Sequence, residues 1–131
     1  MMKTKETIRP TEGELEILSV VWERGSATVR EVYEAISAER PMVYTGVLKL
    51  MQIMADKGLV IRDESARAHV YRAAVKKDET ERRFVRDLSR RLFAGSSAQL
   101  ALRALEMEPA SEEEVVEIRK LLARWRQEAG Q

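Results

Sequence analysis

The stretch PMVYTGVLKLMQIMADKGLVIRDESARAHVYR, residues 41–72, carries the strongest structural signal in the chain. Its first half places apolar residues at the i, i+3, i+4 and i+7 spacing of one helix face. These residues are Val47, Leu50, Met51 and Met54. Gly58 follows where a left-handed helix cap is wanted. We therefore predict a helix over residues 44–57 that ends at Gly58 and packs Met51 and Met54 into a core.

Two short extended segments follow the glycine. Residues 59–62 and 68–72 favour strands, because Val70 and Tyr71 prefer extended backbone, and residues 64–67 supply the turn between them. A helix followed at once by a hairpin with basic residues at its turn is typical of a winged helix-turn-helix. In that fold the third helix enters the major groove of DNA.

The helix face opposite the apolar stripe is polar. At about 100° per residue, Thr45, Lys49, Gln52 and Asp56 centre roughly 180° from the stripe. A lysine suits the O6 and N7 atoms of guanine and a glutamine suits adenine, so we predict that Lys49 and Gln52 contact bases. Thr45 can bind a phosphate or pack on a thymine methyl. The alternative is that Lys49 and Gln52 form an ordinary solvent face and that Thr45 caps the helix.

Helix starts are marked three times by a hydroxyl residue followed three positions later by a glutamate, the pattern of a capping box. The pairs are Thr11 with Glu14, Thr28 with Glu31, and Ser111 with Glu114. We predict a first helix that runs to Gly25 and a second that runs to about Ala38. Their apolar stripes are Leu15, Leu18 and Trp22 in the first, and Val29, Val32, Tyr33 and Ile36 in the second.

The composition narrows the class of protein. The chain has 131 residues, of which 44% are hydrophobic and 34% charged, and it has no cysteine. Disulfides and thiolate metal sites are therefore excluded. Because no apolar run approaches the roughly 20 residues that span a bilayer, and no secretory signal is visible, we predict a soluble, cytoplasmic chain without membrane insertion.

Charge is distributed unevenly, although the net charge is only +1. Residues 11–39 hold two arginines against seven glutamates, whereas residues 40–72 hold six basic residues against three acidic ones. The positive charge therefore lies on the predicted helix and wing, as phosphate binding requires.

Four more residues are candidates for DNA contact. Thr28 and Arg30 open the second helix, whose N-terminal amides can hold a phosphate; a purely structural cap is the alternative for Thr28. Arg67 at the wing tip can reach the backbone or minor groove, unless it is a generic exposed arginine. His69, the one histidine, is assigned to the wing, because a lone imidazole is poor evidence for a metal.

Residues 77–131 show helical periodicity without strands. We predict helices from Asp78 to a break at residues 95–97, over about 98–106, and over about 111–127. So few residues scarcely form a stable core, and dimerisation is the economical way to cover their apolar faces. The residues predicted to form the dimer contact are Leu88, Leu92, Val115, Ile118, Leu122 and Trp125. The predicted fold is mostly α with a small β wing: a winged helix-turn-helix domain over residues 1–76 and a helical dimerisation domain over residues 77–131.

Several of these motifs together resemble the penicillinase-repressor family of winged-helix regulators, and the likeness extends over nearly the whole chain. The motifs are Glu14 to Trp22, Thr28 to Val32, Tyr44 to Leu48, Lys57 to Val60, and Arg67 to Tyr71. The resemblance implies a homodimeric transcriptional repressor that binds a palindromic operator in double-stranded DNA. Many members are inactivated by cleavage that a membrane-bound sensor protease causes, so such a protease is an implied partner.

This chain departs from the family pattern at four points. The family commonly has a threonine where this chain has Gly46 and an arginine where it has Ile53, so the operator is expected to differ; Gly46 is kept among the DNA-contacting positions. The copper-sensing branch has a cysteine cluster that this chain lacks. Members that respond to β-lactams are cleaved at an Asn-Phe pair, and Arg103-Ala104 stands there, so that induction route is not carried over.

An enzyme is not predicted, because no nucleophile motif, phosphate loop or histidine-carboxylate group is present. No cofactor is expected either. The competing hypothesis is a winged-helix adaptor whose outer helix face binds a protein without sequence-specific DNA binding. The basic wing speaks against this alternative.

Overall fold

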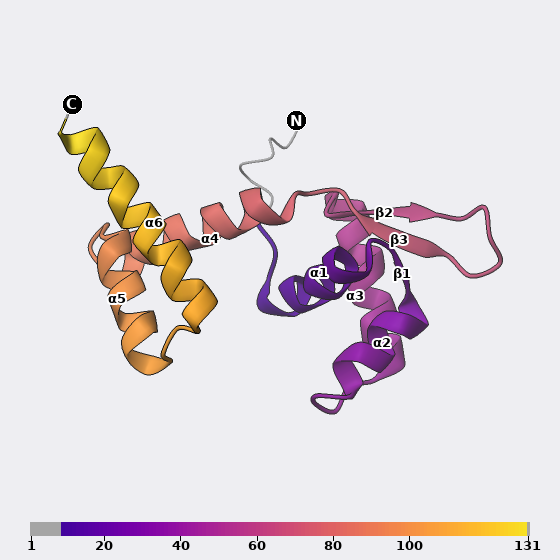
Figure 1. Ribbon diagram of the computed structural model, residues 1–131. Coiled ribbons are helices and arrows are strands. Elements are labelled where there is room, and N and C mark those ends of the chain that lie inside the picture. Colours follow the sequence, from indigo (N-terminus) through magenta and orange to yellow (C-terminus); the bar gives the residue numbers. More distant parts are fainter. Residues whose placement is uncertain (1–8, 131) are drawn as a thin grey trace. The chain divides into compact units, whose positions relative to one another are not determined.

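The computed structural model describes residues 9–130, which form two compact units. The first unit ends at Glu81 and the second begins at Arg82, so the two meet inside one helix. The elements up to the wing are α1 (Glu12–Arg24), β1 (Ala27–Thr28), α2 (Val29–Ser37), α3 (Tyr44–Lys57), β2 (Val60–Asp63) and β3 (Val70–Ala73), as Figure 1 shows. The remaining elements are α4 (Lys77–Leu92), α5 (Ser97–Met107) and α6 (Glu112–Ala129). The predicted fold class, mostly helical with a small β wing, is confirmed.

All three predicted capping boxes are present, at the starts of α1, α2 and α6. At α2 the Thr28 hydroxyl accepts from the Glu31 N–H at 3.1 Å, and the Glu31 carboxylate accepts from the Thr28 N–H at 2.9 Å. Helix α3 begins differently. Its N-cap is Val43, which offers no side-chain acceptor, so the alternative that Thr45 caps this helix is wrong.

The wing belongs to a three-stranded antiparallel sheet of order β1-β3-β2. Strand β1 was not predicted, because two residues are too few to show an alternating pattern. It pairs Ala27 with Tyr71 and Thr28 with Val70. The sheet therefore ties the outer strand pair of the wing directly to the start of α2.

The wing strands lie slightly later in the chain than predicted. Strand β2 starts at Val60, because the N–H of Leu59 donates to the Met54 carbonyl at 2.9 Å and so belongs to the cap of α3. Strand β3 starts at Val70, so residues 64–69 form a longer connection than the predicted four-residue turn.

The core of the first unit lies among α1, α2, α3 and the sheet. The predicted stripe of α3 is confirmed: Val47, Met51 and Met54 are fully buried, and Leu50 is half-buried. The predicted stripe of α1 is shifted. Its buried apolar residues are Ile17, Leu18 and Val21, whereas Leu15 and Trp22 are half-buried. Trp22 lies at the edge of the core because its indole N–H donates to the Val75 carbonyl at 3.0 Å.

The second unit has very little core of its own. Of its described residues only Ser89 is buried, with its hydroxyl donating to the Val85 carbonyl at 2.7 Å. No residue of α5 or α6 is buried. Apolar side chains on all three helices are instead exposed, including Leu92, Leu102, Met107 and Trp125.

Candidate nucleic-acid interface

The outer face of α3 is open to a partner. Thr45, Gly46, Lys49 and Gln52 are all exposed there. A Cβ built on Gly46 would meet nothing within 4 Å, so this position is a flat place on the helix and not a packing requirement. The four residues predicted for contact on this helix therefore form one accessible polar surface.

A hollow of about 280 Å³ lies in the first unit between the start of α2, helix α3 and the wing. The residues that line it are Thr28, Val29, Arg30, Tyr44, Leu48, Gln52, Arg62, Arg67, Ala68, His69 and Tyr71. Five of the eight residues predicted to contact DNA are among them: Thr28, Arg30, Gln52, Arg67 and His69. The lining includes three arginines and no carboxylate, so the hollow offers an anion several donors and positive charge.

Aromatic rings hold Arg30 at this hollow. Its guanidinium carbon lies 4.8 Å from the centroid of the Tyr44 ring and 5.9 Å from that of Tyr33. The two rings meet edge to face with centroids 5.5 Å apart. Cation–π contacts of this kind limit the rotamers of an arginine without consuming its N–H donors. Arg30 is therefore oriented while its donors stay available.

The negative charge of Glu31 at this end of α2 is paired within the protein. The backbone N–H of Thr28 and then the side chain of Arg24 hold the pKa of the Glu31 carboxyl below its ordinary value. Arg24 lies 2.5 Å from Glu31, so the one carboxylate in the first turn of α2 is neutralised within the protein. An incoming phosphate would meet the N–H groups of this turn and Arg30.

The wing supplies two different kinds of arginine. Arg62 is exposed but interacts with other residues of the wing. A hydrogen bond with Tyr71, and then the charge of Glu64, raise the pKa of Arg62. The Arg62–Glu64 contact measures 2.9 Å. Arg67 is exposed and has no ion pair among residues 9–130, and His69 beside it is exposed as well.

Sequence reasoning missed Tyr44 and Arg62 as parts of this site. The Arg30–Tyr33 spacing of three residues is a visible helical signal. The Arg30–Tyr44 contact joins two different helices, so the spacing of residues within either helix could not predict it. Arg62 was counted only as positive charge, although the hollow places it beside Tyr71.

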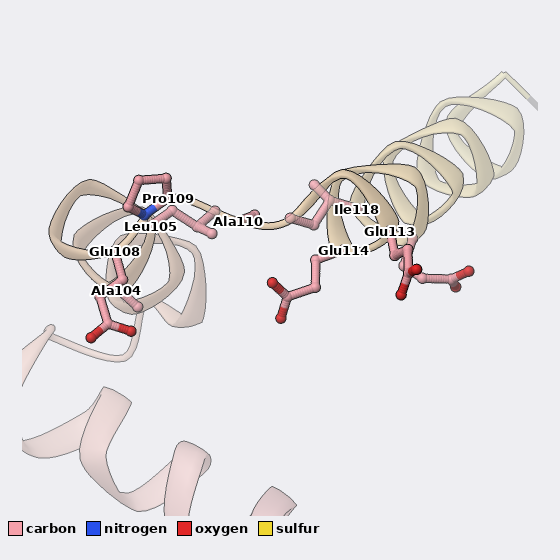
Figure 2. A pocket seen from close by; sticks show the side chains of 9 residues that line it. Ala104, Leu105, Glu108, Pro109, Ala110, Glu113, Glu114 and Ile118 are labelled. Atoms are coloured by element: carbon pink, nitrogen blue, oxygen red, sulfur yellow. The ribbon is translucent and has the colours of Figure 1, made fainter.

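The second unit has two hollows of opposite charge. One, of about 520 Å³, lies between α5 and α6, with Leu105 and Glu108 on one side and Glu114 and Ile118 on the other, as Figure 2 shows. Glu113 and Glu117 complete its acidic lining. The other, of about 550 Å³, lies along α6 and is lined by Arg119, Leu122, Ala123, Arg126 and Gln127. The predicted contact residues Ile118 and Leu122 line these hollows, and Trp125, three residues after Leu122 on α6, is exposed.

Residues 9–130 contain neither a cluster of metal ligands nor a membrane-spanning helix. No group of three or more histidine, aspartate or glutamate side chains there could hold a metal ion. No helix in that range is long and apolar enough to cross a membrane.

Comparisons with known proteins give a consistent result. A family model described as the penicillinase repressor matches residues 10–124. The transcriptional regulator BlaI of Mycobacterium tuberculosis is 40% identical over 70 residues, about half of its length and half of this chain. The methicillin resistance regulatory protein MecI of Staphylococcus aureus is 20% identical over 117 residues, which cover 89% of this chain and 95% of MecI. These relatives are named as regulators and not as enzymes.

One solved structure extends the likeness to the fold. The DNA-binding domain of the repressor BlaI matches 60% of this chain and 93% of its own length, with a TM-score of 0.50 and 22% identity. At that identity the match supports the fold and nothing finer.

Proposed function

The chain belongs to the penicillinase repressor family, and from this premise we propose that it is a transcriptional repressor that binds a palindromic DNA operator as a homodimer. The observation that carries the proposal is the hollow in the first unit. Residues from the start of α2, from α3 and from the wing converge on it. Three of them are arginines that can donate hydrogen bonds to an anion, and none is a carboxylate that would repel it. A surface built from these three elements is what a winged helix uses to hold a duplex.

Within this proposal the residues divide by task. Lys49 and Gln52 read base edges in the major groove from the exposed face of α3. Thr28 and Arg30 hold a backbone phosphate at the start of α2, and Arg67 and His69 of the wing contact the backbone or minor groove. Thr45 and Gly46 lie where the first turn of α3 approaches the duplex.

The case for a homodimer rests on the second unit. Its apolar side chains are exposed, including Leu88, Leu92, Leu122 and Trp125, and such a surface is costly to leave in water. Its acidic and basic hollows lie on one unit, as a self-complementary two-fold interface needs. A dimer also matches the two half-sites of a palindrome, whose centres lie about 34–36 Å or a multiple apart.

Lys49→Ala is expected to cost about 1–3 kcal/mol at one base pair and to relax the sequence preference there. The measurement is a selection from random duplexes with wild type and variant, followed by affinities on the sequence that wild type enriches. Lys120→Ala on α6 serves as the control, because it removes an exposed lysine outside the first unit. If Lys49→Ala enriches the same operator with the same affinity, α3 is not the reading helix.

Arg67→Ala is expected to weaken binding to all sequences by one common factor and to lower the slope of log affinity against log salt by about 1.8, because each protomer of the homodimer loses one phosphate contact. A phosphate contact predicts this behaviour because it releases a counterion but reads no base. Titrations of the enriched duplex and of a random duplex at several salt concentrations measure it. A loss confined to the enriched duplex would contradict the backbone role.

The same titrations separate the repressor from a protein-binding adaptor. An adaptor predicts no enrichment from random duplexes and an affinity for DNA that barely responds to salt. The positively charged lining of the hollow favours the repressor.

A further inference from the structure

The C-terminal part of helix α4 is strongly basic, and the DNA-reading surface does not include it. Residues 82–91 contain five arginines against one aspartate, an excess of four. The predicted helix and wing reach an excess of only three over residues 40–72. A charge concentrated in so short a segment favours a polyanionic ligand.

The arginines are sorted to one side of the helix. At about 100° per residue, four of them fall within an arc of about 100°, which we name the arginine arc of α4. Its members are Arg82, Arg83, Arg86 and Arg90. The apolar residues of the same helix occupy a separate arc, centred about 160° away. They are Phe84, Val85, Leu88 and Leu92.

The arginine arc and the apolar arc of α4 suit different partners. Val85, Leu88 and Leu92 are exposed in the single chain and form the face that the proposed dimer covers. The arginine arc then points away from that interface. Arg86 and Arg90 are exposed and form no ion pair among the described residues. Arg82 and Arg83, by contrast, do interact with other groups of the protein.

We propose that the arginine arc of α4 is a second contact surface for duplex DNA, which binds backbone phosphates without reading sequence. Arginine presents a planar fork of donors that matches phosphate geometry. From Arg82 to Arg90 the arc is about 12 Å long, a length over which a duplex carries about seven phosphate charges. No large apolar residue falls within the arc, as the core of a protein interface would require.

This inference rests on the proposed function, since it gives the same partner a second surface. The test compares wild type with the double variant Arg86→Gln, Arg90→Gln, in which glutamine preserves helix propensity and removes the charge. The matched control is Arg103→Gln with Arg124→Gln. It removes two exposed arginines of the second unit that lie outside α4. Sedimentation of all three proteins checks that the oligomeric state is unchanged.

We expect the arc variant to lower the slope of log affinity against log salt by about 3.6, because each lost phosphate contact contributes about 0.9 and the homodimer loses two contacts in each protomer. The loss is the same for a random duplex and for the duplex that wild type enriches, and the control keeps the wild-type slope. If the arc variant also keeps that slope while wild type enriches an operator, the arc is not a DNA surface and the repressor proposal stands.

Two further outcomes separate the arc from the repressor. Steep, arc-dependent binding to random duplexes without any enrichment would support the arc and contradict the proposed repressor. A wild-type chain that binds no duplex at any salt concentration would overturn both.

Discussion

Leu122→Asp is expected to convert the homodimer into monomers and to weaken binding to a two-half-site operator by about 10²–10⁴-fold. Leu122 is 44% exposed in the single chain and lies on the apolar stripe of α6, beside the 54% exposed Trp125. An aspartate there would remove the leucine contact and bring a hydrated charge into the proposed interface. Arg119 and Arg126 line the same hollow, but removing the water from these charges still costs more than the lost leucine contact. A second monomer would then have to bind the second half-site from solution, whereas in the dimer the second protomer is already held close to it.

The matched control is Arg124→Ala, which lowers the net charge by the same one unit on the opposite face of α6. Sedimentation equilibrium reports the oligomeric state, and affinities are measured on duplexes with one and with two half-sites. We expect Leu122→Asp to leave the single half-site affinity unchanged. A variant that sediments as a dimer would move the interface to another part of the chain.

The fold was predictable where the signal is local in the sequence. The stripe of α3 and the cap at Gly58, which has φ 83°, depend on spacing and on one residue type, and both are found as predicted. The three capping boxes are local in the same way. The shifted stripe of α1 shows where this stops. Ile17 and Val21 are buried and Leu15 is not, because the neighbouring elements decide which of several apolar residues faces the core.

The parts that were missed depend on contacts between distant segments. Strand β1 exists because Thr28 pairs with Val70 across the sheet. Two residues are too few to show the alternating pattern that predicts a strand. The stacking of Arg30 on Tyr44 joins two helices in the same way. Sequence reasoning therefore predicted five of the eleven residues that line the hollow, but not the aromatic support that orients Arg30.

The same limit applies to an ion pair between α1 and the end of α3. Glu14 was predicted only as the capping residue of α1, where its carboxylate accepts from the Thr11 N–H at 2.9 Å. The side chain is 2% exposed, and both carboxylate oxygens also accept from the Lys57 ammonium, at 2.9 and 3.0 Å. Lys57 is the last residue of α3, so the pair fixes the end of the proposed reading helix against the start of α1.

Lys57→Met is expected to lower the free energy of unfolding by about 3 kcal/mol, because it leaves the buried Glu14 carboxylate without its cation. Methionine keeps the aliphatic contacts of the lysine stem. Urea unfolding at one fixed protein concentration measures the change, since the stability of a dimer depends on concentration. Arg40→Met is the control: the Arg40–Glu16 pair also anchors to α1 but is 49% and 43% exposed, so its loss should cost less than about 1 kcal/mol.

The companion variant Glu14→Gln with Lys57→Met separates a buried charge from lost packing. Glutamine can still accept from the Thr11 N–H and carries no charge that needs a partner. The double variant should therefore be more stable than Lys57→Met alone, by about 1–3 kcal/mol. If it is instead less stable, the destabilisation of Lys57→Met comes from packing at the end of α3 and not from an uncompensated carboxylate. The ion pair would then have no special part in holding the reading helix.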